Sequence, residues 1–188
     1  LQGQILVKWM KPLSTQLDTV THPGPYVYEV WRSVDGMNYF PVHKEQVPYF
    51  GSPIDTLFID TGINTTMQPM YYKVTLTAKN GTVFSSEPAS SVFLHINPTD
   101  RQNNLTWEAS VPWSNREYDI FRKDNNAYQL IATTSATHYE DKGLSNDILY
   151  CYKIQSKGTY SIQGIEDPIL NFSQEVCSRP IDNVPPCP

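Results

Sequence analysis

The chain has 188 residues and a net charge of −5, and only 18% of its residues are charged. Its 12 tyrosines and 15 prolines suit strands and turns better than long helices. Residues 1–97 carry six basic and seven acidic side chains and residues 98–188 carry eight and twelve, with no clustered Lys/Arg stripe in either half. This balance argues against a nucleic-acid partner, and no run approaches the ~18 apolar residues of a membrane span.

The first half contains a series of short predicted strands separated by polar segments. A strand around Ile5–Trp9 comes first, followed by Tyr28–Arg32, an Asp60-Thr61-Gly62 turn and a strand over Met70–Ala78. In the last of these, Tyr72 and every second residue after it share one face, because strand side chains repeat every two residues. The segments 11–25 and 47–56 are predicted loops, since they are rich in Pro, Gly, Ser and Thr.

The second half repeats these landmarks in the same order. Asn104–Trp107 is followed by Tyr118–Arg122, Asp141-Lys142-Gly143 and Tyr152–Ile154, with a long predicted loop at 158–170. A repeat of roughly ninety residues matches the length of one small sandwich domain. The sequence therefore predicts two modules in tandem.

The junction between the modules lacks an obvious linker. Ser90–Ile96 reads as one extended strand that closes the first module, and Asn97-Pro98 follows at once. We therefore predict modules at 1–97 and 98–184, with 185–188 as the start of a linker to a further domain. The incomplete opening pattern and the Pro-rich end both favour a piece of a longer protein.

These landmarks resemble those of fibronectin type III modules. The resemblance rests on Trp9 and Trp107 in the second strand, a Tyr-x-Val/Ile-x-Arg strand, an Asp-x-Gly turn, and the corner tyrosines Tyr72 and Tyr152. It implies an all-β chain of two tandem immunoglobulin-like antiparallel β-sandwiches. Each should have seven strands, or six in the first module if its first strand is absent, with those two Trp and two Tyr side chains buried.

Three segments of the second module resemble a more specific group of proteins. They are similar to segments of module arrays in large bacterial surface proteins that are gliding-motility-associated or exported by the type IX route. The three segments are Tyr150–Ile154, Ser173–Cys177 and Ile181–Cys187. This resemblance implies an extracytoplasmic location.

No motif in the sequence indicates catalysis or metal binding. The repeated turn residues Asp60, Gly62, Asp141 and Gly143 are interpreted as architectural, with Asp accepting backbone N–H groups and Gly supplying a positive φ. The four histidines lack zinc-ligand spacing, and no nucleophile lies in a catalytic motif. We therefore expect no enzyme activity, no metal and no cofactor.

Aromatic residues outside the core are the best candidates for a binding site. Trp31 and Phe121 alternate with core positions and should point outward, while Trp113, Tyr49 and Phe50 lie in predicted loops. Exposed aromatic rings can stack on sugars or anchor a protein partner. The competing interpretation is that they pack on neighbouring strands.

Three cysteines leave several arrangements open. By alternation Cys151 and Cys177 both face outward, and the resemblance makes their strands neighbours, which predicts a disulfide between them. Cys187 would then be unpaired or would pair with a downstream domain. The alternatives are a Cys177–Cys187 bridge and three reduced thiols in a cytoplasmic protein.

The sequence thus predicts non-catalytic spacer and interaction modules of a larger secreted or cell-surface protein. Partners would be a protein or a carbohydrate at the surface, together with neighbouring domains of the same chain. The first alternative is an ancillary carbohydrate-associated region of a secreted polysaccharide-degrading enzyme. A tandem cytokine-receptor ectodomain is a further alternative, although the first module has no cysteine and the second no Trp-Ser-x-Trp-Ser motif.

Overall fold

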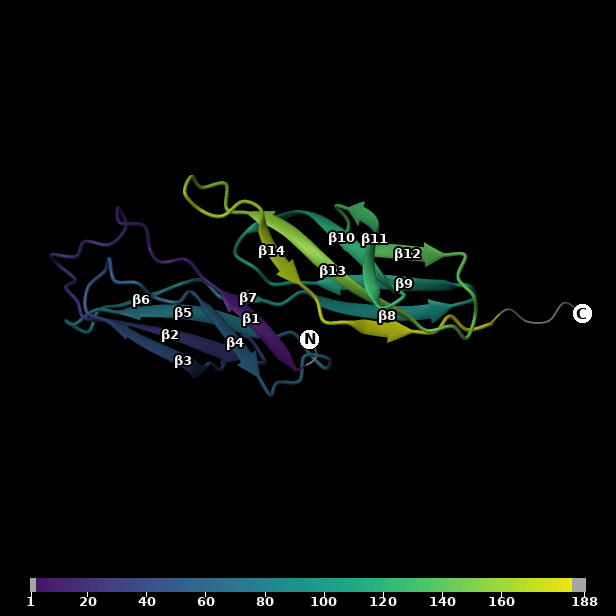
Figure 1. Cartoon of the computed structure of the whole chain (residues 1–188), viewed down its shortest axis with the longest axis horizontal. Coiled ribbons are helices and arrows are strands. Elements are labelled where there is room, and N and C mark those ends of the chain that lie inside the picture. Colours follow the sequence, from purple (N-terminus) through teal and green to yellow (C-terminus); the bar gives the residue numbers. More distant parts are fainter. Residues whose placement is uncertain (1–2, 184–188) are drawn as a thin grey trace, which may run out of the picture. The chain divides into compact units, whose positions relative to one another are not determined.

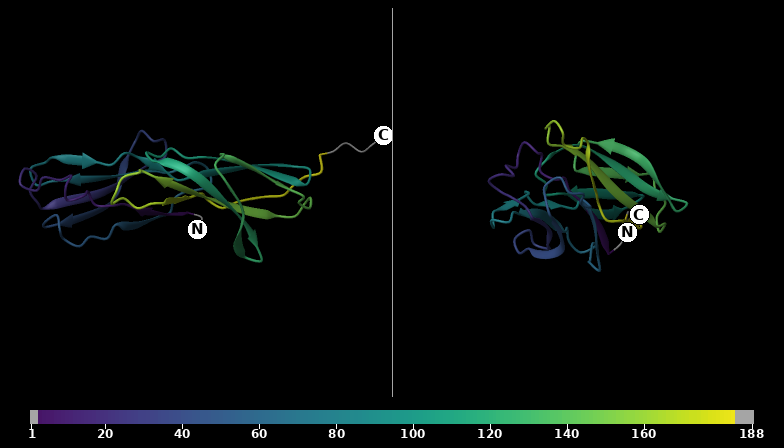
Figure 2. Two further views of the ribbon diagram at one scale, coloured as in Figure 1. Left: turned by 90° about the horizontal axis from the view of Figure 1, so that it is seen from above. Right: turned by 60° about the vertical axis from the view of Figure 1, so that its left-hand side comes forward.

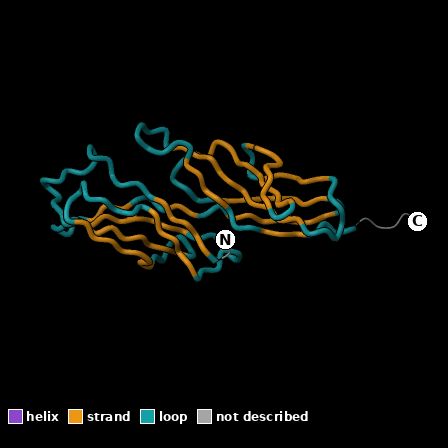
Figure 3. Tube along the Cα trace, in the orientation of Figure 1, coloured by secondary structure: helices purple, strands orange, loops and turns teal. Residues whose placement is uncertain are grey.

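The computed structural model describes residues 3–183 and divides the chain into two compact units. The first unit is Gly3–Ser90 and the second begins at Ser91. All regular elements within the described residues are strands, as Figures 1 and 3 show. No helix is therefore long and apolar enough to cross a membrane in this part of the chain.

The first module is built from two antiparallel sheets. One sheet has the order β1-β4, and the other has the order β3-β2-β5-β6 with β7 also paired to β5. The strands are β1 (Gln4–Lys8), β2 (Tyr26–Ser33), β3 (Phe40–Val47), β4 (Leu57–Thr61), β5 (Tyr71–Thr77), β6 (Val83–Ser85) and β7 (Ala89–Ser90).

The second module has the same plan with one strand more. Its smaller sheet has the order β12-β9-β8, and its larger sheet has the order β11-β10-β13-β14 with β15 also paired to β13. The strands are β8 (Phe93–Thr99), β9 (Gln102–Glu108), β10 (Ser114–Asp124), β11 (Ala127–Thr134), β12 (His138–Lys142), β13 (Tyr150–Thr159), β14 (Ile169–Phe172) and β15 (Val176–Ser178).

Strand for strand, β9–β15 repeat β1–β7, and β8 has no counterpart in the described part of the first module. The last strand is broken in both copies, as β6 with β7 and as β14 with β15. Counting each broken strand once, residues 3–183 form a six-stranded and a seven-stranded sandwich with the fibronectin type III order of strands. Both can be followed from two further sides in Figure 2. The all-β fold prediction is confirmed.

The predicted boundary after residue 97 is wrong, because the units divide between Ser90 and Ser91. The strand interpreted as the last of the first module is β8, the first of the second, and it pairs with β9 from Phe93↔Glu108 to Thr99↔Gln102. Pro98 does not end this strand, since it lies opposite Asn103. That pair exchanges no ladder hydrogen bonds, so no backbone N–H is needed there. The predicted linker at 185–188 lies outside the described residues.

The cores are formed by the residues that the alternation placed inward. In the second module Trp107, Tyr152 and Ile154 belong to one buried cluster. In the first module Trp9 and Tyr72 pack with Val30, while Tyr28 and Leu76 belong to a second cluster toward the other end. All four landmark Trp and Tyr side chains are buried.

Candidate binding surface

Each module carries a buried ionic network that joins three of the repeated landmarks. In the second module the Asp141 carboxylate accepts hydrogen bonds from the Tyr152 hydroxyl and the Arg122 guanidinium, both at 2.8 Å. In the first module Asp60 accepts from Tyr72 at 2.9 Å and from Arg32 at 3.0 Å. Both carboxylates are buried. The expected role of Asp in capping backbone N–H groups of the turn is therefore corrected, because these carboxylates bind side chains of the facing sheet.

The network changes the acidity of both corner tyrosines. Burial, aided by the charge and hydrogen bond of Asp60, raises the pKa of Tyr72. Burial likewise raises the pKa of Tyr152, and the hydrogen bond to Asp141 acts in the same direction. The turn glycines that follow each Asp have φ values of 72° at Gly62 and 74° at Gly143, which other residues adopt only with strain. These repeated residues hold the fold and are not free for chemistry.

The predicted outward aromatics Trp31 and Phe121 belong to a second repeated cluster. Trp31 lies opposite Lys73, and Phe121 lies opposite Lys153. Each lysine ammonium lies over a tyrosine ring, with Lys73 4.5 Å from the centre of Tyr39 and Lys153 4.6 Å from the centre of Tyr128. Trp31 also donates from Nε1 to Thr75 at 3.0 Å. Both aromatics are half-buried. Their occurrence at equivalent positions of both copies favours a framework role, although a binding role stays a prediction.

The predicted loop aromatics have different surroundings. Trp113 is half-buried over Gly158, donates to the Asn115 side chain at 3.1 Å and meets Tyr160 edge-on at 5.9 Å. Phe50 packs edge-on against the core residue Tyr26, whereas Tyr49 is 62% exposed. The loop pair predicted from sequence is therefore split, with one ring turned to the core and one to the surface.

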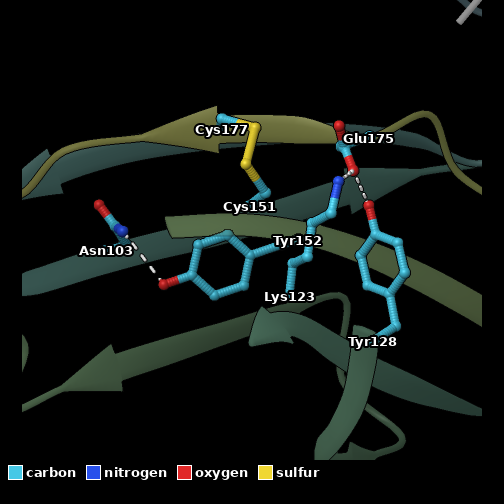
Figure 4. Close-up of a disulfide and its surroundings, with 7 residues drawn as sticks. All are labelled: Asn103, Lys123, Tyr128, Cys151, Tyr152, Glu175 and Cys177. Carbon is cyan, nitrogen blue, oxygen red and sulfur yellow. Dashed lines mark hydrogen bonds and ion pairs between the residues drawn. A yellow bond between two sulfur atoms is a disulfide. The ribbon is translucent and has the colours of Figure 1, made fainter. Parts of the chain in front are cut away.

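Cys151 and Cys177 form a disulfide on the outer face of the larger sheet in the second module. They lie directly opposite each other on β13 and β15, with 4.0 Å between Cα atoms. Glu175 lies beside the bridge, where it accepts from Tyr128 and pairs with Lys123 at 3.3 Å (Figure 4). The two sulfurs and this carboxylate are close enough to share a metal ion, but the sulfurs are bonded to each other. The oxidised protein therefore does not offer a thiolate site here.

The clearest difference between the two copies is an apolar outer face on the β1–β4 sheet. Leu6 is 62% exposed and lies opposite Ile59, which is 58% exposed, and Leu57 next to them is 46% exposed. The two copies can be aligned by an equivalent backbone hydrogen bond that each contains. It runs from Trp9 N to Thr56 O in the first module and from Trp107 N to Thr137 O in the second. In this alignment the residues equivalent to Leu6, Ile59 and Leu57 are Asn104, Glu140 and His138. The face is thus apolar in the first module and polar in the second.

Sequence reasoning missed this face, although a signal was present. Ile5-Leu6-Val7 and Leu57-Phe58-Ile59 are unbroken apolar runs, whereas Asn104-Leu105-Thr106 alternates. A strand that is apolar on both faces is normally covered on both. The runs therefore predict that the second face of this sheet is also apolar, and we define Leu6, Leu57 and Ile59 as the β1–β4 patch.

Comparison with known proteins gives a likeness to solved structures only. No protein-family model matches the chain, and no curated protein matches it. The chain is similar to the sixth fibronectin type III domain of human fibronectin type III domain containing protein 3, with TM-score 0.40 and 19% identity over 52% of this chain and 90% of that one.

Two multi-domain arrays are similar over most of the chain. The central fibronectin-III array of RIM-binding protein has TM-score 0.36 and 14% identity over 100% of this chain and 67% of that one. The FN1–FN3 domains of chicken CNTN1 have TM-score 0.37 and 11% identity over 95% and 60%. At these scores the likeness carries nothing beyond the fold, which follows from the strand pairing itself.

Proposed function

We propose that this chain is a non-catalytic pair of spacer and interaction modules of a larger cell-surface or secreted protein, and that it binds a protein partner through the β1–β4 patch. The observation that carries the proposal is the contrast between the copies. Two modules with the same framework need the same kinds of buried residues. A surface feature that is present in only one of the modules is therefore not required by the fold. Leu6, Leu57 and Ile59 are such a feature, and exposed apolar clusters mark interaction sites.

The groups that resemble catalytic ones are engaged in structure. Asp60 and Asp141 are held by Arg and Tyr side chains, and Glu175 is held by Tyr128 and Lys123. This engagement supports a role in binding rather than turnover. The disulfide supports an oxidising compartment, and the resemblance of the second module to type IX-exported arrays supports a bacterial surface protein.

The test is a selection of random displayed peptides on the full chain. A variant with Leu6→Asn, Leu57→His and Ile59→Glu gives the first module the residues of the second. The matched control is Leu130→Asn, since Leu130 is 55% exposed in the second module. We expect peptides selected by the wild type to keep binding the control and to lose binding to the triple variant. Equal binding to all three proteins, or no selected peptide, would overturn the proposed surface.

The carbohydrate alternative predicts a different pattern. Of the five aromatic residues predicted as binding candidates, Tyr49 is the most exposed. Binding to a glycan array that is lost in Tyr49→Ala and kept in the triple variant would favour the ancillary carbohydrate role. Hydrolysis of a polysaccharide, ester or peptide panel, abolished by one substitution, would contradict the non-catalytic assignment.

A further inference from the structure

Three side chains that can bind a metal converge on the outer face of the larger sheet in the second module. Cys151 lies on β13 directly opposite Cys177 on β15. Glu175 precedes Cys177 by two residues, which is the spacing that keeps two side chains on one face of a sheet. The two sulfurs and a Glu175 carboxylate oxygen all lie within 4.8 Å of one another (Figure 4). Two neighbouring segments of the sheet therefore bring three potential ligands together.

The carboxylate of Glu175 is held in place through only one of its oxygens. The Tyr128 hydroxyl donates to Oε2, and the Lys123 ammonium donates to the same oxygen at 3.3 Å. No hydrogen bond to Oε1 is formed within residues 3–183. Carboxylates that bind metals are themselves oriented by hydrogen bonds from an outer layer of side chains. Glu175 therefore has both the support of a metal ligand and an oxygen that is free to bind.

Two lysines offset the negative charge that a reduced site would carry. Lys123 pairs with Glu175, and Lys153, two residues from Cys151 on the same strand, lies 4.6 Å from the centre of the Tyr128 ring. Metals bind the thiolate form of cysteine, which neighbouring ammonium groups favour. The same ammonium groups repel a free cation. Binding at this place therefore requires all three anionic ligands together.

The first module shows that the shared framework does not require these ligands. Tyr71 and Ser90 form the pair that is equivalent to the two cysteines. Pro88 stands at the position of Glu175. A disulfide would account for the cysteines of the second module, but it does not account for a carboxylate that is oriented beside them by two donors.

We propose that the reduced second module binds one Zn²⁺ through the sulfurs of Cys151 and Cys177 and the Oε1 atom of Glu175, and that formation of the disulfide removes this site. Tetrahedral zinc has Zn–S bonds of about 2.3 Å and Zn–O bonds of about 2.1 Å, which place neighbouring ligand atoms about 3.5–3.8 Å apart. The three atoms already lie within 4.8 Å of one another. Water takes the fourth position. This site is independent of the β1–β4 patch.

The disulfide and the zinc ion exclude each other chemically. A dithiol reductant opens the bridge in two exchange steps, because one of its thiolates attacks a cysteine sulfur and the other then displaces that cysteine. The S–S bond of the protein breaks, a disulfide forms in the reductant, and the two thiol protons of the reductant pass to the cysteines. Zinc binding then releases both protons to water. An oxidising compartment therefore closes the site, and a reducing one opens it.

The test compares zinc binding by the oxidised and the reduced full chain. A trialkylphosphine reduces the bridge, is itself oxidised to the phosphine oxide with oxygen from water, and is removed under inert gas before zinc is added. Competition with a chromophoric chelator then gives Kd. We expect one Zn²⁺ per reduced chain with a Kd of about 1 µM or tighter, and binding at least about 100-fold weaker by the oxidised chain. Equal affinity of the two forms, or no binding by the reduced chain, would overturn the proposal.

Variants that keep both cysteines test the carboxylate. Glu175→Gln removes the charged oxygen and should weaken zinc binding about 100-fold, whereas Tyr128→Phe removes only an orienting donor and should weaken it about tenfold. Glu140→Gln is the matched control, because Glu140 is an exposed glutamate on the other sheet of the same module. Unchanged affinity in Glu175→Gln would show that two thiolates alone hold the ion and would overturn the three-ligand site.

Cobalt reports the ligand set directly. Co²⁺ in a tetrahedral site with thiolates gives a sulfur-to-metal charge-transfer band and intense visible bands. We expect these bands in the reduced wild type and in Cys187→Ser, and their loss in Cys151→Ser and in Cys177→Ser. The same bands in a variant that lacks both Cys151 and Cys177, or their loss in Cys187→Ser, would assign the metal to other ligands and contradict the proposal.

Discussion

Removing the Asp141 carboxylate tests whether the repeated ionic network holds the fold. Asp141→Ala leaves the buried Tyr152 hydroxyl without its acceptor, although that hydroxyl oxygen still accepts from Asn103 at 3.1 Å. An unmet buried donor costs about 1–3 kcal/mol. The Arg122 side chain is 32% exposed and can turn to water, so its lost ion pair adds about 1 kcal/mol at most. Together these losses should lower the unfolding free energy of the second module by about 1–4 kcal/mol.

Differential scanning calorimetry with chemical denaturation measures this loss. Because the modules are separate compact units, Asp141→Ala should lower one transition and Asp60→Ala the other, with additive effects in the double variant. Asp124→Ala is the control, since Asp124 is exposed in the same module as Asp141. A cost at Asp141 below about 0.5 kcal/mol, the range of ordinary surface substitutions, would refute the reasoning. So would an equal shift of both transitions.

Three further changes have defined outcomes. Replacing both Cys151 and Cys177 by Ala removes a disulfide with a sequence separation of 26, which should lower the stability of the second module by about 3 kcal/mol. A lower unfolding temperature of the first module would contradict this. Because the folded pKa of Tyr152 is raised above its unfolded value near 10, its contribution to stability is complete below about pH 10 and is lost as pH rises beyond it. Alkaline denaturation should therefore be less steep in Tyr152→Phe, and an unchanged slope would show that this tyrosine ionises as easily when folded. A Cβ at Gly158 would lie 2.2 Å from Trp113 Cδ1, so Gly158→Ala should displace the indole, red-shift its fluorescence and cost about 1–3 kcal/mol; unaltered emission would refute the packing of Trp113 on this glycine.

The duplicated sequence made the framework predictable. Because Trp9, Asp60 and Tyr72 recur at matching places, the fold class could be predicted without structure. The partner of Asp60 could not, since Arg32 is 28 residues away and the contact depends on how two sheets face each other. The sequence therefore predicted a local role for Asp60 in its turn, whereas the structure gives it a partner on the facing sheet.

The module boundary was predicted wrongly and the apolar surface was not predicted, for different reasons. The predicted strand ended at Ile96, two residues before Pro98, but a proline is tolerated where a strand needs no backbone donor. The β1–β4 patch was missed because the alternation within strands identified core residues, whereas Leu6 and Ile59 lie on the outer face of their sheet. Comparing the two copies position by position exposes the patch.

The central claim is that the first module binds a partner through Leu6, Leu57 and Ile59. The most direct measurement is a map of amide chemical-shift changes in the isotope-labelled full chain when it is titrated with a peptide that the wild type selects. We predict that the largest changes lie on β1 and β4, and that they vanish in the Leu6→Asn, Leu57→His, Ile59→Glu variant. Changes confined to the second module, or to the loop that carries Tyr49, would contradict the account.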